Sequence, residues 1–287
     1  MLKNYLSLIK FSHTIFALPF ALIGFTLASS KQEYSFTWDK LIFVLLCMIF
    51  ARSAAMAFNR YIDKDVDTAN PRTAKIREIP NGKINAGSAL RFVIVNCMLF
   101  MGGAYLLNSL CFLLSPIALL VILGYSYSKR FTALCHLILG LGLSLSPIGA
   151  YLAVTAQFDI LPILFSCIVL FWVSGFDVIY ALQDENFDKQ FNLHSIPVLL
   201  GQKNALRFSR LMHIIAAAII LFIGINYFAT STLFWIATTL FIGLLINQHR
   251  LVKPGDLTKI NLAFFTNNGI ASLIFGSLIV IELITNN

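Results

Sequence analysis

The sequence predicts an all-helical, polytopic membrane protein with nine transmembrane helices. Of its 287 residues, 58% are hydrophobic and only 12% are charged, whereas soluble domains average about 25% charged residues. The apolar residues gather into stretches long enough to cross a bilayer, and the charged residues gather between them. The net charge of +8 would suit a nucleic-acid binder only with a solvated basic face, which this chain lacks. We therefore expect a lipid bilayer, and no nucleic acid, around the chain.

A helix needs about 20 mostly apolar residues to cross the hydrocarbon core, and nine stretches meet this requirement. They are residues 11–29, 41–58, 90–107, 110–127, 133–153, 160–181, 211–229, 231–247 and 262–283. Residues 1–10 form a short amphipathic lead-in. No small-residue cleavage site follows the first stretch, so we expect it to remain in the mature protein. Residues 1–287 are interpreted as a single domain.

The positions of Lys and Arg predict how these helices are oriented. With a cytoplasmic N-terminus, 18 of the 21 Lys and Arg residues fall in cytoplasmic segments, and only Lys31 and Lys40 fall in outer loops. The positive-inside rule therefore predicts a cytoplasmic N-terminus and an outer C-terminus in the cell inner (plasma) membrane. Two of the cytoplasmic loops, 59–89 and 182–210, are long and polar, and such loops are usually functional.

A first acidic motif follows the second apolar stretch. Asn59, Asp63 and Asp67 are spaced four residues apart, so they share one face if the helix continues. Three oxygen ligands without Cys or His suit a hard cation such as Mg²⁺, which proteins hold with one or two carboxylates and substrate phosphates. The alternative is a solvated helix end whose acids pair with Arg60 and Lys64.

A second acidic motif follows the sixth stretch. Asp184 and Asp188 are spaced four residues apart, and Asp177 precedes Asp184 by seven residues, which places it on the same face about 10 Å deeper. A carboxylate at that depth is costly and indicates function. Because like charges at this spacing repel, two such motifs on one membrane side favour cations between them, such as two metal ions bridging a diphosphate.

Diphosphate also needs cationic ligands, which the cytoplasmic loops supply. The predicted binding residues are Arg72, Arg77, Lys129 and Arg130, with Tyr125 in the same turn as the last two. Arg forms two parallel hydrogen bonds with phosphate, and Lys provides a point charge. We interpret Lys83, Lys203 and Lys253 differently, as charge that only orients the chain.

Arg52 lies inside the second stretch, seven residues before Asn59. It should therefore lie at a depth similar to that of Asp177 and on the motif face of its helix. Two interpretations stay open. Arg52 forms a buried ion pair with Asp177, or it binds an anionic group of a second substrate.

Six segments resemble the UbiA superfamily of intramembrane aromatic prenyltransferases. They are KFSHTIFALPFALIGF (10–25), NRYIDKDVD (59–67), NPRTAKIREIPNGKI (70–84), SYSKRFT (126–132), DVIYALQDENFD (177–188) and NLHSIPVLLG (192–201). The first is similar to the opening span of the branch that prenylates 4-hydroxybenzoate. The resemblance extends from residue 10 to about residue 280, and paired acidic motifs at this separation are highly specific.

The resemblance implies a bundle of nine helices around a central cavity, with Mg²⁺ held by the two motifs. Matched residue by residue, the metal ligands would be Asn59, Asp63, Asp67, Asp184 and Asp188. The four carboxylates among them would be catalytic, with Asp177 or the diphosphate as proton acceptor. This chain has Asn59-Arg60 where many relatives have Asn-Asp, which removes one possible ligand.

The implied reaction is transfer of a polyprenyl group from polyprenyl diphosphate to a small aromatic acid in quinone biosynthesis. Mg²⁺ and the basic residues would stabilise the charge that develops on diphosphate. Aromatic faces would stabilise the allylic cation, and burial would exclude water. The start of the chain and the segment after the second motif favour 4-hydroxybenzoate as acceptor; a (di)hydroxynaphthoate of menaquinone synthesis is the alternative.

A membrane transporter of an anionic substrate is the main alternative of another class, because transporters also contain intramembrane charges and gating loops. Inverted repeats would place the two acidic motifs on opposite sides of the membrane, whereas both are predicted on one side. A phosphatidyltransferase is a further alternative, but its DGxxAR-type motif is absent from the sequence.

Overall fold

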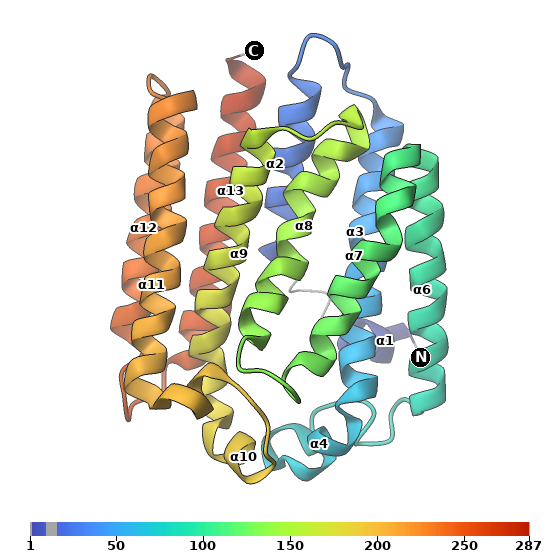
Figure 1. The fold of residues 1–287 in the computed structure, drawn as a ribbon, viewed down its shortest axis with the longest axis vertical. Helices are drawn as coiled ribbons and strands as arrows, with labels where there is room; N and C mark the ends of the chain where they lie inside the picture. The colour runs from blue at the N-terminus through green and yellow to red at the C-terminus, as the bar shows by residue number, and fades with distance from the viewer. Residues whose placement is uncertain (1, 10–15, 287) are drawn as a thin grey trace.

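The computed structural model describes residues 2–9 and 16–286, which form a bundle of long helices (Figure 1). The α-helices are α1 (Leu2–Leu8), α2 (Leu18–Ser29), α3 (Trp38–Ile62), α4 (Lys64–Ala69), α5 (Pro71–Ala74), α6 (Ala86–Leu107), α7 (Ser109–Ser128), α8 (Cys135–Thr155), α9 (Ile160–Ala181), α10 (Glu185–Gln190), α11 (Ile196–Tyr227), α12 (Thr232–Leu251) and α13 (Asn268–Thr285). A 3₁₀ turn, η2 (Leu182–Asp184), follows α9, and a π-helix, η3 (Leu262–Asn267), precedes α13.

The predicted helical membrane fold is confirmed. Within the described ranges, eight helical segments are long and apolar enough to span a membrane, and the shorter apolar helix α2 covers part of the first predicted stretch. Residues 11–15 of that stretch, and Lys10 before it, lie outside the described residues. The last predicted stretch, 262–283, is formed by η3 and α13 together.

The two segments predicted as long polar loops are largely helical, which corrects the sequence analysis. Helix α11 begins at Ile196 instead of near residue 211. Its first turns contain Lys203, Arg207 and Arg210, all exposed, so hydropathy fails to detect a helix that continues beyond its apolar part. In the other segment, α3 extends to Ile62, and the short helices α4 and α5 follow it.

Trp172 of α9 is fully buried at the centre of the aromatic core. Its ring lies 5.5 Å from that of Phe20 on α2, 5.2 Å from Phe176 on α9 and 5.5 Å from Phe241 on α12, centroid to centroid. Its indole N–H donates to Oδ1 of Asn268 at 3.1 Å, so the buried polar atom is satisfied. This packing fixes α9, the helix that leads into the second acidic motif.

The two acidic motifs lie at one end of the bundle. Figure 1 shows α4 and α10, which contain Asp67 and Asp188, together at that end, and the C-terminus at the opposite end. Near the opposite end, Lys31 pairs with Asp159, the residue that caps α9, at 2.6 Å. This hydrogen bond lowers the pKa of Asp159 below its ordinary value. The ends of the bundle therefore differ: within the described residues, one end has a single ion pair and the other has the charged motifs.

Gly24 of α2 packs directly against the backbone of α8, where an added Cβ would overlap the carbonyl group of Pro147. Because backbone atoms cannot rotate away, we predict that Gly24→Ala lowers the thermal midpoint in detergent, at a cost of about 1–3 kcal/mol. Gly102→Ala on α6 is the matched control, because no neighbouring atom lies within 4 Å of its Cβ position. That variant should be neutral or slightly stabilising. Equal midpoints in the two variants would contradict the close α2–α8 contact.

Candidate active site

A cavity of about 950 Å³ runs through the bundle between α3, α7, α8 and α9. Near α4 and α10 its lining is polar and includes Asn59, Asp63, Arg72 and Asp184. Farther along, the lining is apolar and reaches Phe158, in the α8–α9 connection at the other end of the bundle. The cavity therefore has a charged mouth and a long apolar interior.

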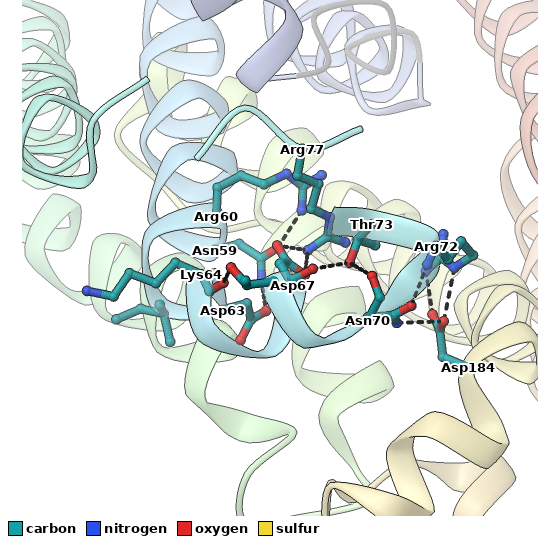
Figure 2. A network of polar contacts seen from close by, with 12 residues as sticks. Asn59, Arg60, Asp63, Lys64, Asp67, Asn70, Arg72, Thr73, Arg77 and Asp184 are labelled. Carbon is teal, nitrogen blue, oxygen red and sulfur yellow. Dashed lines mark hydrogen bonds and ion pairs between the residues drawn. The ribbon is translucent and has the colours of Figure 1, made fainter. Parts of the chain in front are cut away.

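The first acidic motif lies where α3 ends. Asn59 Nδ2 donates to Asp63 Oδ2 at 2.9 Å, and Arg130 lies 3.6 Å from the other oxygen of Asp63. Burial, with a smaller contribution from the charge of Asp67, raises the pKa of Asp63 above its ordinary value. Asp67 is 4% exposed, pairs with Arg77 (Figure 2) and is not part of the cavity lining. Only Asn59 and Asp63 of this motif therefore face the cavity.

Arg72, on the short helix α5 that follows the first motif, binds the second motif. Its Nε donates to Asp184 Oδ1 at 3.0 Å and its Nη2 to Oδ2 at 2.5 Å. Asn70 caps α5 by accepting the Arg72 N–H at 2.9 Å, and its Nδ2 donates to Asp184 at 3.2 Å (Figure 2). The Arg72 guanidinium also lies 5.8 Å from the centre of the Tyr180 ring. One cap residue thus fixes both the start of α5 and its link to the second motif.

Asp188, the other acid of the second motif, is fully buried and pairs with Lys129 at 2.8 Å. Ser195 donates to Asp188 Oδ2 at 3.4 Å and also caps α11 by accepting the Val198 N–H. The Lys129 carbonyl accepts the His194 N–H at 2.7 Å. The turn after α7 is thereby tied to the start of α11, and Lys129 lines the cavity while Asp188 does not.

Arg52, Tyr125 and Asp177 also line the cavity, but the proposed Arg52–Asp177 pair is wrong. Asp177 Oδ2 instead lies 2.7 Å from His136 Nδ1. The Ile196 N–H donates to His136 Nε2 at 3.3 Å, so we assign the proton of a neutral imidazole to Nδ1, where it is donated to Asp177. Arg52 Nε is buried without a hydrogen-bond partner among the described residues.

His136 and Asn70 are two site residues that the sequence alone did not predict. His136 lies in the predicted stretch 133–153, where a titratable side chain is as costly as Arg52 or Asp177, so the same depth argument would have identified it. Asn70 before Pro71 is a typical helix start, which indicates the cap. Its second hydrogen bond, to Asp184, depends on the fold and has no local signal.

The bases predicted to bind diphosphate are the partners of the acids predicted to bind metal. The pairs are Arg72 with Asp184, Arg77 with Asp67, Lys129 with Asp188 and Arg130 with Asp63. Among the residues that the structure describes, no three His, Cys, Asp or Glu side chains cluster closely enough to hold a metal ion. Three side chains that line the cavity could each offer a metal ion an oxygen ligand: Asn59, Asp63 and Asp184. Oxygen ligands fit a hard cation that completes its coordination with substrate phosphates.

Comparison with known proteins identifies the family. The model of the UbiA prenyltransferase family matches residues 17–269. The chain belongs to this family. The 4-hydroxybenzoate octaprenyltransferase of Aliivibrio fischeri is 29% identical over 240 residues, which cover 83% of this chain and 82% of the relative. That of Vibrio parahaemolyticus is 27% identical and covers 85% of each chain.

Solved structures agree with this assignment. The apo structure of a UbiA homolog from Aeropyrum pernix is 32% identical, with a TM-score of 0.83 over 94% of this chain and 98% of that one. A UbiA homolog from Archaeoglobus fulgidus, bound to GPP and Mg²⁺, is 20% identical with a TM-score of 0.76 over 98% and 99% of the two chains, which supports the fold. This UbiA-family chain is a membrane-embedded prenyltransferase, so the transporter alternative is set aside.

We predict that Arg72 and Asp184 of this UbiA-family protein are energetically coupled in the absence of substrate. Arg72→Gln and Asp184→Asn should each lower the thermal midpoint, because each leaves a poorly hydrated charge without its partner. The double variant should recover part of the loss, with a coupling free energy of about 1–2 kcal/mol. Thermal unfolding of the four proteins in detergent measures this coupling, and strictly additive shifts would contradict it.

Proposed function

We propose that this enzyme transfers a polyprenyl group from polyprenyl diphosphate to a small aromatic acid, with 4-hydroxybenzoate as acceptor. The observation that carries the proposal is the cavity, whose charged mouth continues into a long apolar interior. This shape suits a substrate with a diphosphate at one end and an apolar chain at the other. The relatives named 4-hydroxybenzoate octaprenyltransferase support this acceptor and a role in ubiquinone biosynthesis.

We propose that the ion pairs at the mouth exchange partners when substrate binds. The four bases would turn to the diphosphate and release the acids. The residues that would then hold Mg²⁺ are Asn59, Asp63, Asp67, Asp184 and Asp188. Bound there, Mg²⁺ would stabilise the negative charge on the leaving diphosphate. Because the bases gain a polyanion and the acids gain a cation, no buried charge is left without a partner.

Aromatic side chains beside the mouth would stabilise the prenyl cation. Breaking the allylic carbon–oxygen bond leaves the electron pair on diphosphate and a positive charge on the prenyl group. Tyr180 lines the cavity and stacks on Phe264 at 4.1 Å between ring centroids. Its ring already lies near a cation, the Arg72 guanidinium. An aromatic face attracts a carbocation for the same reason.

The deeper polar residues would bind the acceptor. Arg52 lines the cavity, and its Nε has no partner among the described residues, so a carboxylate would satisfy it. The electron-rich ring of the acid forms the new carbon–carbon bond and then loses a proton to Asp177 or to diphosphate. By donating from Nδ1, His136 would orient the Asp177 carboxylate toward the acceptor, as a positioning residue.

We also propose the orientation that the charges predict. The N-terminus and the ends of α4 and α10 would be cytoplasmic, and the C-terminus would lie outside in the inner membrane. Residues 1–287 would act as a single domain. The support is the excess of Lys and Arg in segments expected on one side, and the location of the C-terminus opposite α4 and α10 in Figure 1.

Asp63→Ala and Asp184→Ala should each reduce turnover by at least about a hundredfold, because each removes a charge that would stabilise the transition state. The assay uses purified protein, a polyprenyl diphosphate, Mg²⁺ and a panel containing 4-hydroxybenzoate and dihydroxynaphthoate. Asp65→Ala is the matched control, because Asp65 belongs to the same loop but is exposed and does not line the cavity. Full activity in either Asp63→Ala or Asp184→Ala would contradict the shared metal site. If dihydroxynaphthoate were the only acid prenylated, it would take the place of 4-hydroxybenzoate as the proposed acceptor.

Arg52→Lys should raise the Michaelis constant for the aromatic acid about tenfold and leave that for the polyprenyl diphosphate unchanged. The reason is that Lys retains the charge but loses the paired hydrogen bonds of a guanidinium to carboxylate. Steady-state kinetics with each substrate varied in turn separates the two constants. An unchanged constant for the acid would eliminate the binding role of Arg52.

A further inference from the structure

A second pocket, of about 460 Å³, opens between the ends of α11 and α12. These ends lie at the same end of the bundle as α4 and α10 (Figure 1). Six of the lining side chains are basic or imidazole: Lys203, Arg207, Arg210, His249, Arg250 and Lys253. The lining shares no residue with the central cavity. The pocket is therefore a separate concentration of positive charge at the edge of the apolar bundle.

The basic side chains of this pocket have no direct ion-pair partner in the part of the chain that the structure describes, and Lys253 is influenced only at longer range by the exposed Asp256. Within residues 2–9 and 16–286, none of the Lys and Arg side chains of the pocket forms an ion pair, and the lining contains no acid. Asp256, in the same turn as Lys253, instead accepts hydrogen bonds from the N–H and hydroxyl groups of Thr258 at 3.1 and 2.7 Å. The Gly255 N–H donates to Gln202 at 3.0 Å, which holds this turn against α11.

His249 adds an unpaired acceptor to the pocket. The Trp172 carbonyl lies 3.2 Å from His213 Nε2, so that nitrogen carries the proton and His213 Nδ1 is an acceptor. His249 Nε2, 2.9 Å from His213 Nδ1, is then the donor. The remaining His249 nitrogen, Nδ1, therefore presents a lone pair, and it is buried without a partner among the described residues. A ligand that satisfies it must bring a hydroxyl or another donor.

Exposed apolar side chains continue from the pocket along both helices. Ile214 follows Arg210 by one turn of α11 and is 57% exposed, and Ile246 precedes His249 by one turn of α12 and is 50% exposed. Residues three or four apart lie on one helix face. From the end of the bundle inward, the pocket thus presents exposed cations, then the buried acceptor His249 Nδ1, and then an apolar surface.

We propose that this pocket binds the headgroup of an anionic glycerophospholipid that carries a free hydroxyl, as phosphatidylglycerol does. The phosphate lies among the Arg and Lys side chains, the headgroup hydroxyl donates to His249 Nδ1, and the acyl chains pack along Ile214 and Ile246. Basic pockets between helix ends favour anionic headgroups. Lys203 and Lys253 are therefore ligands as well as determinants of orientation.

Native mass spectrometry of the purified full chain, titrated with single lipids in detergent, tests the site. We expect phosphatidylglycerol to bind more tightly than phosphatidylmethanol, which has the same charge but lacks the headgroup hydroxyl, and both to bind more tightly than the net-neutral phosphatidylethanolamine. Replacing Arg207 and Arg210 by Gln should weaken phosphatidylglycerol binding about 25-fold, or about fivefold for each charge. Lys83→Gln with Arg91→Gln is the control, since it removes two charges outside both pockets and should change binding less than twofold.

His249→Leu isolates the contribution of the hydroxyl. It should bring phosphatidylglycerol down to the affinity of phosphatidylmethanol and leave phosphatidylmethanol binding unchanged. Equal affinity of the unmodified protein for phosphatidylglycerol and phosphatidylethanolamine, or equal losses in the Arg207/Arg210 and control variants, would overturn the proposal. Displacement of the lipid by an equal concentration of glycerol 3-phosphate would also overturn it, because the site would then belong to a soluble anion.

Discussion

The pairing of opposite charges at the mouth of the cavity is the interaction on which the site depends. Asp67 and Asp188 are almost fully buried, and a carboxylate removed from water needs a nearby positive charge. Arg77 and Lys129 supply it, and Arg72 does the same for Asp184. Because the partners come from different segments, these pairs join α5, the turn after α7, η2 and α10 into one polar layer over an apolar bundle.

This arrangement is suited to binding a polyanion and metal cations together. A site made only of carboxylates would repel diphosphate, and one made only of bases would repel a metal ion. Pairs that already contain both charges can accept the two together while the net charge of the layer changes little. The apolar interior beyond the layer has room for a prenyl chain, so in the proposed reaction one cavity would hold both the diphosphate and the apolar chain.

Much of this was predictable because charge is scarce in the sequence. The motif of Asp63 and the motif of Asp184 stand out against long apolar stretches, and the structure places both at one end of the bundle. Which charged residues pair was not predictable, because it depends on how each helix is rotated about its axis. Arg52 and Asp177 were expected at a similar depth, which suggested that they pair, whereas His136 is the partner of Asp177. Hydropathy likewise located the apolar part of α11 but not its first turns, where exposed bases continue the same helix.

We propose that substrate displaces the protein's own ion pairs, and a structure of the complex would show whether it does. The measurement is the structure of the full chain bound to Mg²⁺ and an unreactive prenyl thiodiphosphate. We expect that Arg72 leaves Asp184 and contacts the diphosphate, and that Asp184 becomes a metal ligand. A complex in which the Arg72–Asp184 pair stays intact and the diphosphate binds elsewhere would contradict it.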